Sequence, residues 1–198
     1  MARPRMFDEE RALGAAMRTF WEKGYEATST QDLCDATGLG RSSIYNTFKS
    51  KHDLFARALT HYIDTTTATQ LVILGDSRLS GADRLRALLA VIVDAETEHR
   101  TGGRSMGCLT VNTTVELAGR DPMAASLLER DTARRLAALR AVIEEGRRDG
   151  SITSPREAGA LARFVNAAIG GMRVSGQGGA DRATLESIAE VTLDALTR

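Results

Sequence analysis

The placement of the three prolines most constrains what this chain can fold into. Pro4, Pro122 and Pro155 all lie outside the periodic apolar segments. Proline lacks a backbone donor and clashes with the preceding helical turn, so it is rare inside helices. The segments between the prolines carry apolar residues three and four positions apart, and they lack the alternation and tight-turn pairs of β-hairpins. We therefore expect an all-α protein of about nine helices.

The first segments predict three short helices in succession. A helix over about Asp8 to Lys23 is indicated by one apolar face, and Gly24 follows where a left-handed residue is favoured. The sequence "STQD" from Ser29 approximates a capping box and opens a second helix, which Gly38 can end. A third is expected over Arg41 to Thr47.

The rest of the chain predicts longer helices. "SKHD" opens the fourth, "SGAD" opens the fifth, and the sixth is expected to hold Cys108 to Ala118. Asp121-Pro122 and Ser154-Pro155 indicate further helix starts, because proline is well tolerated in a first turn. The last two helices should span about 155 to 175 and 182 to 197. The β-branched runs "DTTTATQLVIL" and "TVNTTVEL" favour strands locally, but we expect them to be helical.

Composition and charge narrow the class of protein. The 26 cations balance 26 acids, so net charge does not indicate a nucleic-acid partner, although residues 41 to 57 carry four cations and one acid, a sum of +3. The two cysteines, Cys34 and Cys108, form no CxxC pair, which suits a reducing compartment. No apolar run approaches the roughly 20 residues of a membrane helix, so we expect no membrane association and a cytoplasmic location.

The stretch "GLGRSSIYNTFKSKHDLF" has the pattern of a helix-turn-helix, in which the second helix enters the major groove of DNA. Ile44 and Phe48 lie four residues apart and can pack inward, which leaves polar side chains facing outward. Arginine can pair with guanine and asparagine with adenine, while serine permits close approach and lysine reaches phosphates. A merely solvated helix surface is the alternative for this face.

Residues 8 to 60 resemble the amino-terminal domain of the tetracycline-repressor (TetR) family, through "GYEATSTQDL" and "SIYNTFKSKHDL". Gly40 departs from the serine that often caps the family's recognition helix, and Asn46 and Thr47 replace frequent histidines or aromatics. The resemblance implies a helix-turn-helix domain over 1–50 and an effector-binding and dimerisation domain over 51–198. The implied DNA-binding residues are Thr30, Gln31, Arg41, Ser42, Ser43, Tyr45, Asn46, Thr47, Lys49 and Lys51. Thr30 could instead serve only to start its helix.

For the second domain the resemblance implies a homodimer on double-stranded operator DNA, released by a small-molecule effector. The last two helices would form the dimer's four-helix bundle, and their alternative role is an intrachain core. An effector pocket among the fourth to eighth helices would be mostly apolar. "MGCLTVNTTVEL" resembles a subgroup with Gly-Cys-Leu early in the sixth helix, which includes repressors that respond to electrophiles and oxidants. Cys108 and Asn112 are therefore the effector or redox candidates, although a buried cysteine often serves only as a small hydrophobe.

Other classes of function leave little trace in the sequence. The three histidines show no HExxH motif or metal-ligand spacing, "GLGRSS" lacks a preceding strand, and no GxSxG occurs. We therefore expect no enzyme activity, no metal and no cofactor. A helical dimer that binds protein partners or RNA is the second alternative, and activation instead of repression stays open.

Overall fold

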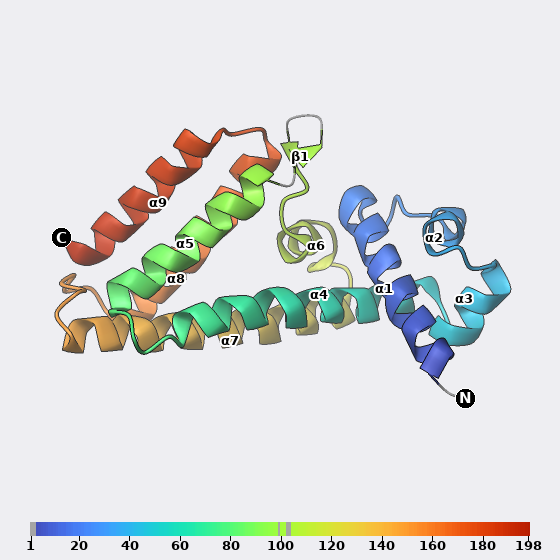
Figure 1. Cartoon of the computed structure of the whole chain (residues 1–198), viewed down its shortest axis with the longest axis horizontal. Coiled ribbons are helices and arrows are strands. Elements are labelled where there is room, and N and C mark those ends of the chain that lie inside the picture. Colours follow the sequence, from blue (N-terminus) through green and yellow to red (C-terminus); the bar gives the residue numbers. More distant parts are fainter. Residues whose placement is uncertain (1–2, 99, 102–103) are drawn as a thin grey trace. The chain divides into compact units, whose positions relative to one another are not determined.

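The computed structural model describes residues 3–98, 100–101 and 104–198, without the side chains of residues 3–8, 100, 101 and 104. These residues form nine α-helices and one pair of two-residue strands (Figure 1). The helices are α1 (Arg3–Lys23), α2 (Thr30–Thr37), α3 (Arg41–Phe48), α4 (Lys51–Leu74), α5 (Gly81–Glu98), α6 (Leu109–Leu117), α7 (Pro122–Arg148), α8 (Ala158–Gln177) and α9 (Arg182–Thr197). The strands β1 (Arg100–Thr101) and β2 (Arg104–Ser105) pair antiparallel. The expected all-α class is confirmed.

The chain divides into two compact units. The first unit comprises Met1–Thr65 with Asn112–Leu128, and the second comprises Thr66–Val111 with Glu129–Arg198. The first unit thus holds α1 to α3 together with a segment that follows them by more than sixty residues. The boundary that the sequence predicts between two domains, after residue 50, stays a prediction.

The first unit is built around aromatic side chains. Phe20 and Phe55 are fully buried, with ring centroids 5.1 Å apart in an edge-to-face arrangement. Trp21 and Tyr62 make a similar pair at 4.9 Å. Edge-to-face pairs add stabilisation beyond the burial of their area, because the positive ring edge meets a negative face. This cluster fixes α1 against the start of α4.

The second unit has an aliphatic core between α5, α7, α8 and α9 (Figure 1). Ile92, Met172 and Leu185 are fully buried in it. One charged pair is also buried: Arg173 Nη1 lies 2.6 Å from Glu96 Oε1. The Ser105 hydroxyl donates to the same carboxylate, so this buried charge has partners from α8 and β2.

Of the two proline-based helix starts, one is confirmed and one is wrong. Asp121 Oδ1 accepts hydrogen bonds from the amides of Met123 and Ala124, and α7 begins at Pro122. At the other site α8 begins at Ala158 instead of Pro155, and Glu157 caps it by accepting from the amides of Gly159 and Ala160.

The late start of α8 has a tertiary cause. The backbone amides of Thr153 and Ser154 donate to the Leu196 carbonyl at the end of α9, at 3.1 and 3.0 Å. These bonds hold the segment before Pro155 in a non-helical conformation. A contact with a residue more than forty positions away is invisible to local capping rules.

Both β-branched runs are helical, as expected. In α4 the Thr65 hydroxyl donates back to the carbonyl of His61, and the Thr67 hydroxyl donates to the buried carboxylate of Asp131. Threonine can remain helical when its hydroxyl bonds to a backbone carbonyl of its own helix or to a side chain of another helix. Tertiary partners thereby override the local strand preference.

Candidate nucleic-acid interface

Helix α2 is closed at both ends by local contacts. Ser29 and Asp32 form a reciprocal capping box: the amide of Asp32 donates to Ser29 Oγ, and the Ser29 amide donates to Asp32 Oδ2. At the other end Gly38 adopts a left-handed conformation with φ 69°, and its amide bonds to the carbonyl of Cys34. Short helices are marginal alone, and these caps satisfy the donors and acceptors that would otherwise be open.

Helix α3 follows after a turn and is attached from one side only. Ile44 and Phe48 are both 0% exposed, while Ser42 and Asn46 on the opposite side are exposed. The spacing of four between the two apolar residues places both on one face. The helix therefore presents its polar side outward, which is the geometry a major-groove reader requires.

The predicted DNA-binding residues lie together on α2, α3 and the start of α4 in the first unit. The exposed members are Gln31, Arg41, Ser42, Ser43, Asn46, Thr47 and Lys49, and the half-buried members are Thr30, Tyr45 and Lys51. The Thr30 hydroxyl and the Tyr45 phenol are 2.8 Å apart and share a hydrogen bond. This bond joins the first turn of α2 to the middle of α3.

Several of these side chains already have partners within the chain. Arg41 lies over the Tyr45 ring, with 5.9 Å between its guanidinium carbon and the ring centroid. Gln31 Nε2 donates to Asp35 Oδ1 at 2.8 Å along α2. These are contacts of surface groups, and each can be exchanged for a base or phosphate at small cost.

Lys49 and Lys51 occupy the link between α3 and α4. Lys49 is the C-cap of α3 and has φ 55°, a conformation that costs a non-glycine residue free energy. The Lys51 ammonium lies 4.5 Å from the centroid of the Tyr25 ring. An aromatic face beneath an ammonium fixes its position without neutralising its charge. Lys51 is thus placed beside α3 as a localised cation.

Asp32 and Tyr25, both close to the predicted DNA-binding residues, have shifted pKa values. Hydrogen bonds from Lys23 and Ser29 hold the pKa of Asp32 well below its ordinary value. Burial raises the pKa of the Tyr25 phenol, with smaller contributions from the carboxylates of Glu26 and Asp121. The capping carboxylate is therefore ionised, and the phenol neutral, at any pH at which the protein would work.

Sequence reasoning missed the contacts that residues 112–128 make within the first unit. Glu116 accepts hydrogen bonds from the backbone amides of Tyr25 and Glu26. His52 Nε2 lies 2.6 Å from Asp121 Oδ2, in an ion pair if the imidazole is protonated. These partners are separated by at least 69 residues in the sequence, and no spacing rule relates them.

The effector candidates lie at α6. Cys108 directly precedes the helix, and its side chain is buried with Sγ 3.1 Å from the Thr110 hydroxyl. Gly107 has φ 68°, and its amide donates to Ser105 Oγ, the same hydroxyl that donates to Glu96. Asn112 is half-buried on α6. The thiol therefore lies in a tightly hydrogen-bonded turn at the amino end of a helix.

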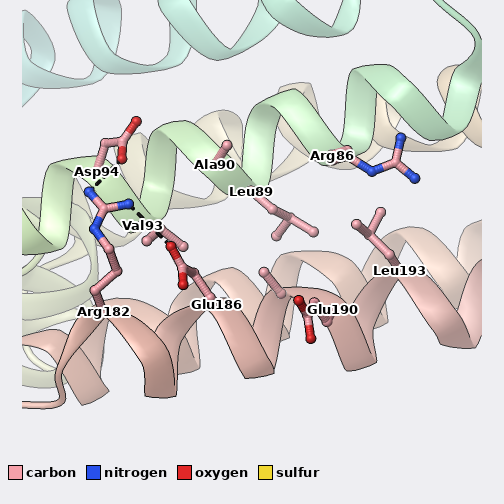
Figure 2. Close-up of a pocket in the computed structure, with 10 residues that line it drawn as sticks. Arg86, Leu89, Ala90, Val93, Asp94, Arg182, Glu186, Glu190 and Leu193 are labelled. Carbon is pink, nitrogen blue, oxygen red and sulfur yellow. Dashed lines mark hydrogen bonds and ion pairs between the residues drawn. The ribbon is translucent and has the colours of Figure 1, made fainter.

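A groove of about 280 Å³ lies between α5 and α9 in the second unit. Leu89, Val93 and Leu193 supply apolar surface (Figure 2). Figure 2 shows Arg182 at one end, in ion pairs with Asp94 and Glu186. Glu190 and Arg86 also lie on the groove wall. The pocket expected among the fourth to eighth helices stays a prediction.

Neither a metal-ligand cluster nor a membrane-spanning helix occurs in the described part of the chain. No group of three or more His, Cys, Asp or Glu side chains there is arranged to hold a metal ion. None of the helices in the same residues is both long and apolar enough to cross a bilayer.

A short capped helix, a glycine turn and an outward polar helix at the amino end of an all-helical chain define a helix-turn-helix regulator. Comparison with known proteins agrees: residues 12–58 match the model of the tetR family of bacterial regulatory proteins, and residues 81–191 match the tetracyclin repressor-like C-terminal domain. The chain belongs to the TetR family.

Individual relatives extend over nearly the whole chain. The transcriptional repressor ComR of Escherichia coli is 33% identical over 191 residues, which is 96% of this chain and 90% of ComR. A cysteine mutant of the TetR family regulator CifR, solved with 26-base-pair operator DNA, is 27% identical with a TM-score of 0.82, covering 98% of this chain and 99% of that one. Reduced NemR of E. coli has a TM-score of 0.85 at 19% identity, covering 97% and 98%, and shares the fold.

Proposed function

We propose that the protein is a sequence-specific transcriptional repressor that binds an inverted-repeat operator as a homodimer and leaves it when an effector binds. The observation that carries this proposal is the split of α3, whose apolar residues are fully buried while its polar face is open. The relatives support the direction of regulation: ComR is a repressor, and CifR was solved on operator DNA.

In this proposal α3 lies in the major groove. Arg41 pairs with a guanine edge and Asn46 with an adenine, since these side chains match the donors and acceptors of those bases. Ser42, Ser43 and Thr47 allow close approach, and Gln31 and Thr30 approach from the start of α2. Tyr45, Lys49 and Lys51 contact phosphates, which fixes the register of the helix without reading sequence.

The dimer would form through α8 and α9. Phe164 and Val174 on α8 and Val191 on α9 are exposed apolar side chains, at 45%, 54% and 64%. Gly171 lies on the same exposed face of α8 as Phe164, and a Cβ there would meet open space. Small and apolar residues on neighbouring helices favour close helix packing, and a two-fold dimer needs one self-complementary patch.

The effector half is proposed to respond through α6. Cys108 and Asn112 are the candidate residues, and the Cys108 thiol lies directly before the first turn of α6. Treatment with N-ethylmaleimide should release the wild-type protein from DNA, and Cys108→Ser should not be released. Equal release of both would remove Cys108 from this role and leave it as a core residue, while Cys34→Ser serves as the matched control.

Two other classes remain as alternatives to this proposal. A helical dimer that binds RNA or a protein would show no preference for one duplex sequence, and an activator would bind the same operator with the opposite effect on transcription. The relatives of this chain that are transcriptional repressors make an enzymatic function the less favoured alternative. A regulator that binds bacterial operator DNA would work in the cytoplasm.

The direct test is a titration of labelled duplex from upstream of the protein's own gene, followed by fluorescence anisotropy. The proposal predicts saturable binding that weakens steeply with salt and survives an excess of unrelated duplex. The variant Asn46→Ala should lose the preference for this duplex, and Glu129→Ala, exposed on α7 in the second unit, should keep it. Binding that unrelated duplex displaces at equal concentration would reject the proposal.

A further inference from the structure

The turn between α1 and α2 forms a small anion site made of backbone amides. Helix α1 ends at Lys23, and Gly24 has φ 81°, so the chain reverses directly after the helix. The amides of Tyr25 and Glu26 then point to the same side. Successive amides that converge after a left-handed residue attract anions, because their partial positive charges add.

A carboxylate from α6 occupies this site. Glu116 Oε2 lies 3.0 Å from the Tyr25 amide nitrogen, and Oε1 lies 2.8 Å from that of Glu26. Each oxygen thus accepts one hydrogen bond, and both are charge-assisted. Glu116 is half-buried, so water competes only in part for these bonds.

Gly24 is needed for the site on two grounds. Its positive φ is a conformation that L side chains rarely adopt. A Cβ at this position would also stand 3.0 Å from Glu116 Oε2 and 3.2 Å from Oε1, closer than side chains normally approach. The glycine therefore supplies both the backbone turn and the room for the carboxylate.

Tyr25, whose amide Glu116 binds, also contacts Lys51, one of the residues proposed to contact DNA. The ring of Tyr25 lies 4.8 Å from that of Phe55, measured between centroids, and carries the Lys51 ammonium on its face at 4.5 Å. On the other side, the Thr28 hydroxyl donates to the Gly24 carbonyl just before α2 begins. Fixing the backbone at Tyr25 thus fixes the lysine proposed to contact phosphate and the entry to α2.

We propose that Glu116 is a positioning residue for DNA binding: its carboxylate binds the amides of Tyr25 and Glu26 and holds Lys51 and α2 in the geometry that contacts the operator. Only the effect of Glu116 on DNA binding rests on the proposed function; the contact between its carboxylate and the two amides does not. The alternative is that Glu116 only adds stability to the fold. The two differ in whether operator affinity changes under conditions in which the protein is fully folded.

The first measurement is amide hydrogen exchange in the full chain without DNA. Glu116→Gln keeps the size of the side chain and removes its charge, so exchange at the Tyr25 and Glu26 amides should accelerate about tenfold or more, the value of a charge-assisted hydrogen bond. Glu22→Gln, an exposed glutamate at the end of α1, makes the same charge change and should leave both amides unaffected. Unchanged exchange in Glu116→Gln would overturn the site itself.

The second measurement is operator affinity at a temperature well below the unfolding midpoint of every variant. Glu116→Gln should weaken binding about tenfold if the lost bond is fully expressed in the DNA complex. Gly24→Ala should weaken it as well, and the double variant should be no worse than the more affected single one, because both changes break one contact. Full operator affinity in Glu116→Gln, or strictly additive losses, would overturn the positioning role. A wild-type protein that binds no duplex would reject the proposed function, while the exchange experiment would still decide the anion site.

Discussion

Helices α2 and α3 are both eight residues long and adjacent in the chain, yet their ends are closed differently. Helix α2 has a serine N-cap with a full capping box and a left-handed glycine at its end. Helix α3 begins after Gly40, which has no side chain to cap with, and ends at Lys49 with φ 55°. Helix α2 therefore combines closed ends with the buried Leu33, whereas α3 depends on the core beneath it.

The difference agrees with the proposed roles of the two helices, in which α2 supports and α3 reads DNA. An acid in the first turn of α3 would stabilise the helix but would put negative charge where, in the proposed complex, phosphate approaches. Arg41 stands in that first turn instead, against the helix dipole. Helix α3 thus lacks stabilising features at its first turn, and proteins commonly break such local rules at functional sites.

The largest expected effect comes from removing the anchor of α3. Phe48→Ala should destabilise the protein by about 3–5 kcal/mol, because a fully buried aromatic side chain leaves a cavity. Urea unfolding followed by circular dichroism measures this loss. A cost below about 1 kcal/mol would mean that α3 does not depend on the core, and Ser42→Ala, on the exposed face of α3, is a control that should change stability little.

The next largest expected effect is on DNA affinity, and it distinguishes residues that contact bases from residues that contact phosphates. Arg41→Ala should lose about 1–3 kcal/mol of discrimination at one base pair of each half-site. Lys51→Ala should weaken every duplex alike and reduce the slope of affinity against salt by about one. Competition binding against duplexes that vary at single positions distinguishes the two. A uniform loss in Arg41→Ala would show that it contacts phosphate.

Removing the cap of α2 should cost less than removing the anchor of α3. Ser29→Ala is expected to lower stability by about 1 kcal/mol, the usual value of a side-chain N-cap. The change should leave sequence preference intact, since Ser29 caps α2 and lies outside the proposed contacts. Chemical denaturation and competition binding report the two quantities, and a stability equal to that of the wild type would contradict the role of the capping box.

Acid should affect α2 and not α3. The pKa of Asp32 is lowered, mainly by its hydrogen bond from Lys23, so its contribution to stability is complete above the ordinary value of 3.8 and is lost as pH falls through the lower folded value. The stability difference between wild type and Asp32→Asn should therefore shrink as pH falls below 3.8. Unfolding midpoints from pH 7 to 2 provide the measurement, and a constant difference would contradict it.

The smallest effect is the gain from capping α3. Gly40→Ser should stabilise the protein by a few tenths of a kcal/mol, because serine exceeds glycine as an N-cap by about that amount. Differential scanning calorimetry can resolve the shift in melting temperature. No gain would imply that backbone geometry at Gly40, and not the missing side chain, sets the stability of α3.

The sequence predicted what local chemistry decides. Ser29, Asp32 and Gly38 indicated the ends of α2 by their types alone, and the spacing of Ile44 and Phe48 indicated the buried face of α3. Period and capping are properties of neighbouring residues, so they survive in one sequence without a structure.

Contacts over long sequence distances were beyond this reasoning. Pro155 looked like a helix start, but the Leu196 carbonyl holds the preceding residues outside the helix. Glu116 looked like an ordinary helix residue, and only the fold brings it to the amides of Tyr25 and Glu26. For the proposed DNA contacts the sequence identified the face, and the residues that support that face came from the structure.

The most direct test of the account is selection of bound duplexes from a random DNA pool by the full chain, followed by sequencing. The account predicts a two-fold symmetric site, and it predicts that Arg41→Ala selects the same site with one position per half relaxed. A pool that stays random after repeated selection, or a site without symmetry, would contradict the claim that the polar face of α3 reads DNA in a dimer.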